Sequence, residues 1–89
     1  NCLFISVGDG GQRSLAQDKY SMNGKILRIN VTYDPDNIDF LQTNYSIPTD
    51  KNMFFSPSFG LMEIYALGFR NPWRCTLDSE EQDKIYCGD

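Results

Sequence analysis

The stretch from Glu63 to Asp78 reads Glu-Ile-Tyr-Ala-Leu-Gly-Phe-Arg-Asn-Pro-Trp-Arg-Cys-Thr-Leu-Asp, and it predicts a strand, a tight corner and a second strand. The residues before the corner are apolar on both faces of an extended chain, which predicts a strand buried on both sides. Pro72 lacks a backbone N–H and pushes Asn71 towards an extended or turn conformation. We therefore expect the first strand to end at this corner and the second to begin at Trp73.

The corner carries a guanidinium and an amide, from Arg70 and Asn71. A planar guanidinium can bind a carboxylate or phosphate through two hydrogen bonds, so the pair suits an anion-binding or cofactor-binding corner. The alternative is structural: Arg70 caps backbone carbonyls, and Asn71 makes a turn. The residues by themselves leave both interpretations open.

The rest of the chain also predicts strands separated by turns. Leu27, Ile29 and Val31 alternate with polar residues, which predicts a strand with one buried face. Turn signals occur at Gly8-Asp9-Gly10-Gly11 and Asn23-Gly24, and residues 32–61 have no sustained period. Further strands are expected at residues 2–7 and 84–87. The fold class is therefore all-β, a sandwich or propeller fragment, with five strands that fit the end of one propeller blade and the start of the next.

Composition excludes several classes of function. The net charge is −4 and the basic residues are scattered, which argues against nucleic-acid binding. Hydrophobic residues make up 40% of the chain, as expected of a folded protein. The chain has no histidine, so it cannot contain a complete Ser-His-Asp or Cys-His site, and no metal-ligating residue is assigned. No apolar run is long enough to span a membrane.

The three cysteines and two sequons favour an oxidising, secreted setting. A hairpin folded about Glu81 places Cys75 opposite Cys87 on one face, within reach of a disulfide; two buried thiols are the alternative. Cys2 is left over, so any partner is expected outside this chain. Asn30-Val31-Thr32 and Asn44-Tyr45-Ser46 are candidate glycosylation sites at Asn30 and Asn44.

Several motifs together resemble the glucose/sorbosone dehydrogenase family. They are Gly8-Asp9-Gly10-Gly11, Gly24-Lys25-Ile26-Leu27-Arg28-Ile29-Asn30, Tyr45-Ser46-Ile47-Pro48 and Ile64-Tyr65-Ala66-Leu67-Gly68-Phe69-Arg70-Asn71-Pro72. Trp73-Arg74-Cys75 and Tyr86-Cys87-Gly88-Asp89 are similar to the family's animal branch, the hedgehog-interacting-protein-like proteins. The resemblance covers nearly the whole chain and implies that residues 1–89 are part of a six-bladed β-propeller domain.

The resemblance also implies a site. Bacterial members of the family oxidise sugars with pyrroloquinoline quinone (PQQ) and calcium, and an Arg-Asn pair contacts that cofactor; the matching residues here are Arg70 and Asn71. Asp9 matches an aspartate beside the family's general base, a histidine that would lie before Asn1. Asp9 could therefore orient an imidazole and stabilise its protonated form. The calcium-binding segment is expected just after Asp89.

Three functional hypotheses follow. The first is a PQQ- and calcium-dependent oxidoreductase acting on the CH–OH groups of a sugar or alcohol. The second is a secreted, non-catalytic propeller that binds a protein ligand, such as a hedgehog-type signal; the corner 68–74 contains no acidic residue of the kind used for that binding, which weakens this reading. The third is a structural blade in which Arg70 only satisfies carbonyls.

Overall fold

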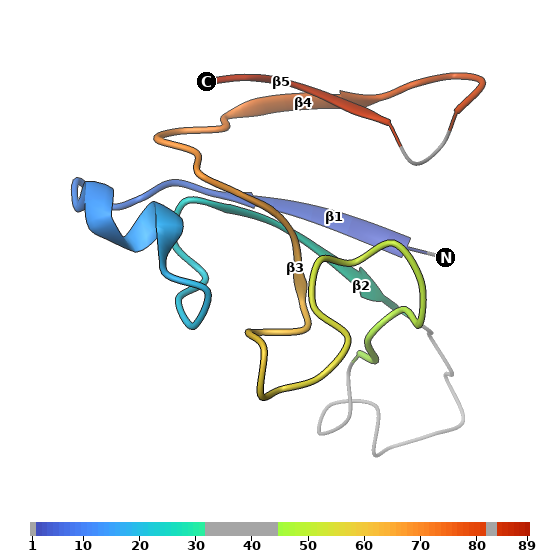
Figure 1. Cartoon of the computed structure of the whole chain (residues 1–89). Helices are drawn as coiled ribbons and strands as arrows, with labels where there is room; N and C mark the ends of the chain where they lie inside the picture. The colour runs from blue at the N-terminus through green and yellow to red at the C-terminus, as the bar shows by residue number, and fades with distance from the viewer. Residues whose placement is uncertain (1, 32–44, 82–83) are drawn as a thin grey trace, which may run out of the picture.

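The computed structural model describes residues 2–31, 45–81 and 84–89. It contains two antiparallel sheets (Figure 1). One is three-stranded, in the order β1-β2-β3, and the other pairs β4 with β5. The strands are β1 (Cys2–Val7), β2 (Lys25–Asn30), β3 (Ile64–Leu67), β4 (Arg74–Leu77) and β5 (Ile85–Gly88), with a short 3-10 helix η1 (Arg13–Gln17) after β1. The expected all-β class is confirmed, and all five strands lie in the predicted regions.

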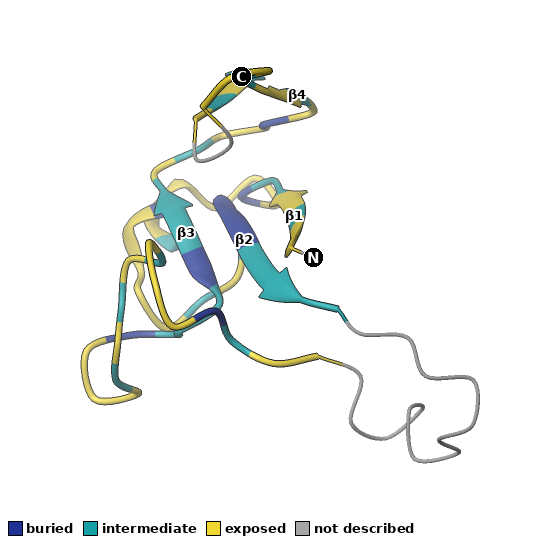
Figure 2. Cartoon of the chain, turned by 90° about the vertical axis from the view of Figure 1, so that its right-hand side faces the viewer, coloured by how far each residue is buried: buried dark blue, intermediate teal, exposed yellow. Residues whose placement is uncertain are grey.

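The second strand is more buried than the alternation predicted. Lys25, Ile26 and Leu27 are consecutive and all buried, at the dark end of β2 in Figure 2. The prediction of a single buried face was therefore wrong for this half of the strand. The reason is position: β2 is the central strand of its sheet, and Lys25 reaches the carbonyl oxygen of Leu15 in η1.

The strand before the corner is shorter than expected. β3 ends at Leu67, and only Ile64 within it is fully buried, so burial on both sides does not extend along the strand. Gly68 has a φ of 95°, a left-handed conformation that turns the chain out of the sheet. The Gly68 and Phe69 N–H groups then donate to the carbonyl oxygens of Ala16 and Gly24, at 2.9 and 3.1 Å. Arg70 and Asn71 consequently lie on a loop, rather than at the end of a strand.

The β4–β5 hairpin has the predicted register. Cys75 lies opposite Cys87 and Leu77 opposite Ile85. Cys75 and Cys87 form a disulfide, and their Cα atoms are 4.1 Å apart. In Figure 1 the hairpin lies above the three-stranded sheet, and the loop that contains Arg70 and Asn71 joins the two sheets.

The described part of the long connection, residues 45–63, is irregular. Asn52 helps to attach it: its Nδ2 donates to the carbonyl oxygens of Arg28 and Met62 at 2.8 and 2.9 Å. Ser46 forms an isolated bridge with Asn30, the last residue of β2. Asn30 is half-buried, and its Oδ1 accepts a hydrogen bond from the exposed Cys2 thiol. The sequon at Asn44 lies outside the described residues.

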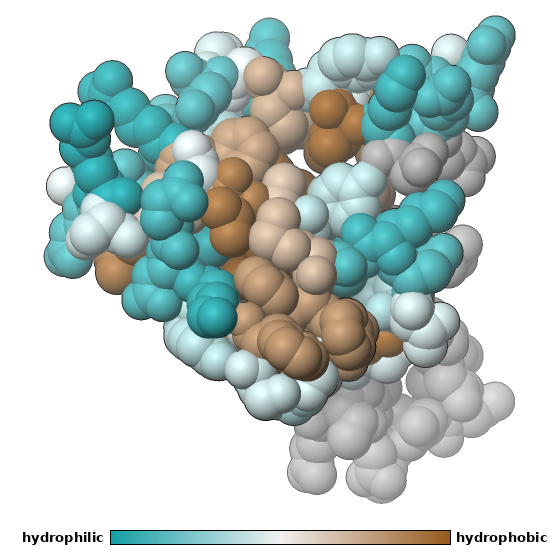
Figure 3. All heavy atoms as spheres, in the orientation of Figure 1, coloured by the Kyte–Doolittle hydropathy of each residue, from teal (hydrophilic) through white to brown (hydrophobic). Residues whose placement is uncertain are grey.

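Apolar side chains gather across the middle of the face shown in Figure 3. Exposed large apolar residues of the chain include Phe55, Phe59 and Trp73. In the part of the chain that the structure describes, no helix is long and apolar enough to cross a membrane.

Candidate functional site

The three candidate site residues meet at one rim of the molecule. Asp9 follows β1, whereas Arg70 and Asn71 lie between β3 and β4, and an open cavity of about 510 Å³ brings them together. The cavity is lined by Gly8, Asp9, Gly10, Gly11, Arg70 and Asn71. The loop motif and the corner motif, which are remote in the sequence, therefore form a single surface.

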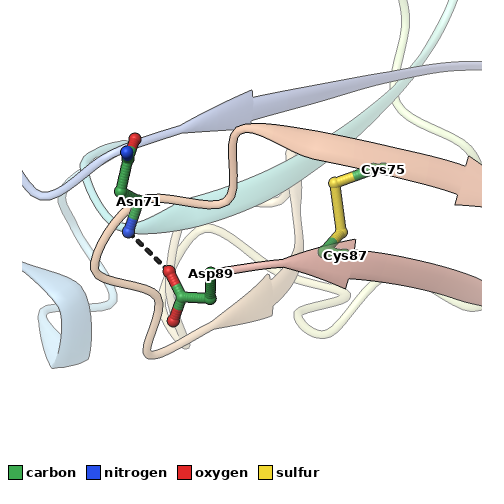
Figure 4. Close-up of a disulfide and its surroundings, with 4 residues drawn as sticks. All are labelled: Asn71, Cys75, Cys87 and Asp89. Atoms are coloured by element: carbon green, nitrogen blue, oxygen red, sulfur yellow. Dashed lines mark hydrogen bonds between the residues drawn. A yellow bond between two sulfur atoms is a disulfide. The ribbon is translucent and has the colours of Figure 1, made fainter.

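The backbone of the corner is held from two sides. The Asp9 N–H donates to the Arg70 carbonyl oxygen at 2.9 Å. The Asn71 N–H donates to Oδ1 of Asp89 at 2.6 Å, as Figure 4 shows, and the Arg70 N–H lies 3.4 Å from Oδ2 of the same carboxylate. With their main chain fixed in this way, both side chains remain exposed at the rim.

The Gly8–Gly11 turn fits closely beneath the corner. Asp9 is buried, and its Oδ1 accepts the Gly11 N–H at 2.9 Å, which closes the turn on itself. A Cβ at Gly8 would lie 3.3 Å from the Arg70 carbonyl oxygen and 3.4 Å from Asn71 Oδ1. The glycine at this position therefore allows the two main chains to approach.

A larger cleft of about 960 Å³ extends from the same corner along η1. Its walls are polar and apolar in nearly equal parts, and they include two guanidinium groups, those of Arg13 and Arg70. The lining residues are Asp9, Gly11, Arg13, Ser14, Ala16, Gln17, Gly68, Phe69, Arg70 and Asp89. A cleft with these groups can accept a ligand rich in hydroxyl or carboxylate oxygens.

The wall formed by η1 is supported by Lys25, a residue that the sequence analysis did not single out. Lys25 is fully buried, and its Nζ donates to the carbonyl oxygens of Leu15 and Asn23, each at 2.7 Å. Burial lowers the pKa of the Lys25 ammonium, and the nearby Asp18 carboxylate partly opposes this shift. A lysine in a strand of alternating polarity is expected to face solvent. The support that Lys25 gives to η1 is therefore evident only from its contact with Leu15.

Asp89 is a second residue that the pattern did not identify as part of the site. The sequence placed it at the end of the Tyr86–Asp89 motif and before an expected calcium segment, without a role in the site, yet its carboxylate binds the corner directly. No pattern in the sequence predicts this contact, because Asp89 reaches the corner only when β5 pairs with β4.

The charges at the corner suit an anionic group. Among the described residues, the Arg70 guanidinium has no ion pair or hydrogen bond, so it is available to a ligand. The carboxylates of Asp9 and Asp89 each already accept backbone N–H groups. Within residues 2–31, 45–81 and 84–89, no group of three metal-ligating side chains occurs.

Comparison with known proteins assigns the chain to a class. The sequence model of the glucose/sorbosone dehydrogenase family matches residues 1–87 of the chain, and the chain belongs to this family. The family is one of β-propellers, and the two antiparallel sheets are a fragment of such a fold.

Named relatives refine this assignment. The chain is 43% identical to the HIPL2 protein and 40% identical to the HIPL1 protein of Arabidopsis thaliana, each over 98% of its length. It is 33% identical over 79% of its length to the YliI aldose sugar dehydrogenase of Escherichia coli K12. These HIPL relatives are plant proteins, and they support the expected resemblance to the hedgehog-interacting-protein-like branch.

The chain spans only 14–15% of the length of these relatives. No solved structure matches it significantly.

Proposed function

We propose that the protein containing this chain is an oxidoreductase that oxidises CH–OH groups of a sugar or related alcohol with PQQ, assisted by calcium. The observation that carries the proposal is the meeting of Arg70, Asn71 and Asp9 around one cavity in a member of the glucose/sorbosone dehydrogenase family. The similarity to an aldose sugar dehydrogenase supports a small-molecule substrate.

Arg70 and Asn71 are the residues that would hold the cofactor. PQQ carries several carboxylates, and it supplies the two-electron acceptor that no protein side chain provides. A guanidinium without an internal partner can bind one carboxylate bidentately, and the Asn71 amide can donate a further hydrogen bond. The Gly8–Gly11 turn has no side chains other than that of Asp9, so an extended planar group can approach its backbone.

Asp9 is proposed to orient the base that removes the substrate proton. Its buried carboxylate has one oxygen engaged by the Gly11 N–H, and among the described residues the other oxygen has no hydrogen-bond donor. A histidine from another part of the protein could donate to that oxygen, and its imidazolium form would be stabilised by the carboxylate charge.

A secreted location is part of the same proposal. The Cys75–Cys87 disulfide supports it, because such bonds persist mainly in oxidising compartments. Glycosylation at Asn30 and Asn44 is proposed on the sequons alone.

The second candidate is a non-catalytic propeller that binds a protein ligand. The relatives named HIPL are compatible with it. This candidate retains the fold and the corner, but it assigns no cofactor to Arg70.

The two candidates differ in their response to PQQ. We would titrate PQQ with calcium into the full-length protein by calorimetry, and repeat the titration with Arg70→Ala. Arg74→Ala is the matched control, because that guanidinium is nearby and exposed but lies over the Trp73 ring, 5.1 Å from its centroid. The oxidoreductase proposal expects calcium-dependent binding that is lost in Arg70→Ala and kept in Arg74→Ala. Unchanged affinity in Arg70→Ala would contradict it.

A further inference from the structure

The Asp89 carboxylate accepts hydrogen bonds from the main chain of the corner, whose Arg70 carbonyl oxygen in turn accepts the Asp9 N–H of the Gly8–Gly11 turn. Its Oδ1 accepts the Asn71 N–H at 2.6 Å (Figure 4). Its Oδ2 lies 3.4 Å from the backbone nitrogen of Arg70. We propose that Asp89 is a positioning residue: it fixes the peptide units from which the Arg70 and Asn71 side chains reach the cofactor. This inference rests on the proposed function, because it assigns Asp89 a role in the same site.

The hairpin explains how one carboxylate can hold this position. Asp89 directly follows β5, whose strand is joined to β4 by the Cys75–Cys87 disulfide. The Trp73 N–H also donates to the Gly88 carbonyl oxygen at 3.2 Å, next to Asp89 in the chain. The end of β5 is therefore fixed against the segment that leaves the corner, and the carboxylate needs little additional ordering to reach it.

Electrostatics gives a second argument for a positioning role. Asp89 lines the same cleft as Arg70 and Arg13. A carboxylate beside a site for an anionic cofactor repels that cofactor, unless nearby N–H dipoles offset part of its negative charge. Here two backbone N–H groups face it, and a charge-assisted hydrogen bond of this kind is stronger than a neutral one. The Asp89 carboxylate therefore stabilises the main chain of the corner, and the Arg70 guanidinium remains available to the ligand.

The test uses Asp89→Ala in the full-length protein, with two measurements. The first is amide hydrogen exchange at Asn71 in the protein without PQQ, which is expected to become faster because the N–H loses its acceptor. The second is the PQQ dissociation constant at saturating calcium, which is expected to rise by roughly tenfold or more on loss of a charge-assisted hydrogen bond. Turnover at saturating PQQ is expected to change less than the affinity.

Asp78→Ala is the matched control. Asp78 lies at the other end of the same hairpin, and its Oδ1 likewise accepts two backbone N–H groups, those of Glu80 and Glu81, at 2.8 and 2.9 Å. Its replacement removes a similar pair of contacts without touching the corner. We expect Asn71 exchange and PQQ affinity to remain as in the wild type, and equal losses in both variants would overturn the positioning role in favour of general hairpin stability.

A conservative variant supplies the rescue. Asp89→Asn keeps a side-chain oxygen for the Asn71 N–H, so its PQQ affinity and Asn71 exchange should lie closer to wild type than those of Asp89→Ala. Unaltered Asn71 exchange in Asp89→Ala would overturn the contact itself. Absence of PQQ binding to the wild-type protein would instead overturn the proposed function and the cofactor part of this inference. The exchange measurement would still decide whether Asp89 fixes the corner.

Discussion

The Asp9 N–H and the Arg70 carbonyl oxygen are joined by a hydrogen bond of 2.9 Å. This bond connects the turn after β1 with the loop between β3 and β4, so two motifs remote in the sequence share one main-chain contact. Asp9 and Arg70 are also the residues to which the family resemblance gives different tasks, orienting a base and binding a cofactor. This bond would keep the base-orienting and cofactor-binding residues at a fixed distance from each other, because neither backbone can shift without breaking it.

Gly24 supports both sides of this contact, and we predict that Gly24→Ala is strongly destabilising. The Gly24 N–H donates to the Gly8 carbonyl oxygen, and its own carbonyl oxygen accepts the Phe69 N–H. Gly24 has a φ of 67°, and an added Cβ would lie 2.6 Å from Ala16 Cα and 2.7 Å from Phe69 O. The left-handed conformation and the clash together should lower the free energy of unfolding by roughly 2 kcal/mol or more, measured by urea denaturation of the full-length protein.

Gly11→Ala separates the two causes. Gly11 also has a positive φ, of 82°, but nothing lies within 4 Å of an added Cβ. Its replacement should cost only the conformational part, about 1 kcal/mol. An equal cost for both variants would mean that the contact of Gly24 with Ala16 is not limiting.

Lys25→Met tests the support of η1. The replacement retains much of the buried volume but removes the Lys25 donor from two carbonyl oxygens, which should cost about 1–3 kcal/mol. The Asn23 oxygen loses the donor described for it, whereas the Leu15 oxygen keeps the Asp18 N–H at 3.1 Å. The exposed Lys19 is the control, and Lys19→Met should leave stability nearly unchanged. Both variants are compared by denaturation, and hydrogen exchange should show faster opening of η1 in Lys25→Met alone.

The sequence predicted the strands well because each has a local signal. A short apolar run before a glycine turn marks β1, and alternation after the Asn23-Gly24 turn marks β2. The hairpin register follows from the period of two, which places Cys75 opposite Cys87. The end of β3 was missed because Pro72 is the more obvious strand breaker. The chain in fact leaves the sheet at Gly68, where contacts with Ala16 and Gly24 take over.

The site was predictable only in part. Arg70, Asn71 and Asp9 follow from motifs, and the structure brings them to one cavity. Lys25 and Asp89 carry no such signal, since their roles arise from contacts between segments that the fold brings together. A buried lysine and a carboxylate that caps a remote loop can be identified only when the neighbours of each are known.

The disulfide predicts a defined chemical result. In peptide maps of the non-reduced protein, Cys75 and Cys87 should appear in one cross-linked species, and they should become alkylated only after reduction. Replacement of both residues by serine should lower the free energy of unfolding by about 3 kcal/mol or less, as expected for a loop with a sequence separation of 12. Alkylation of both thiols without reductant would contradict the pairing.

Asp78 predicts a pH dependence in the hairpin turn. Hydrogen bonds from the backbone N–H groups of Glu81 and Glu80 hold the pKa of the Asp78 carboxyl below its usual range, with a further contribution from the Tyr86 hydroxyl. Because the folded-state pKa is lower than the unfolded-state value, the folded hairpin binds fewer protons between the two values. The contribution of Asp78 to stability is therefore complete above the unfolded-state pKa and is lost as the pH falls through the folded-state pKa.

The Glu80 and Glu81 amide signals should titrate by NMR with a midpoint below that of an ordinary aspartate, and Asp78→Asn should abolish this titration while keeping an acceptor oxygen. A midpoint at the ordinary value would show that the two N–H groups do not stabilise the charged form.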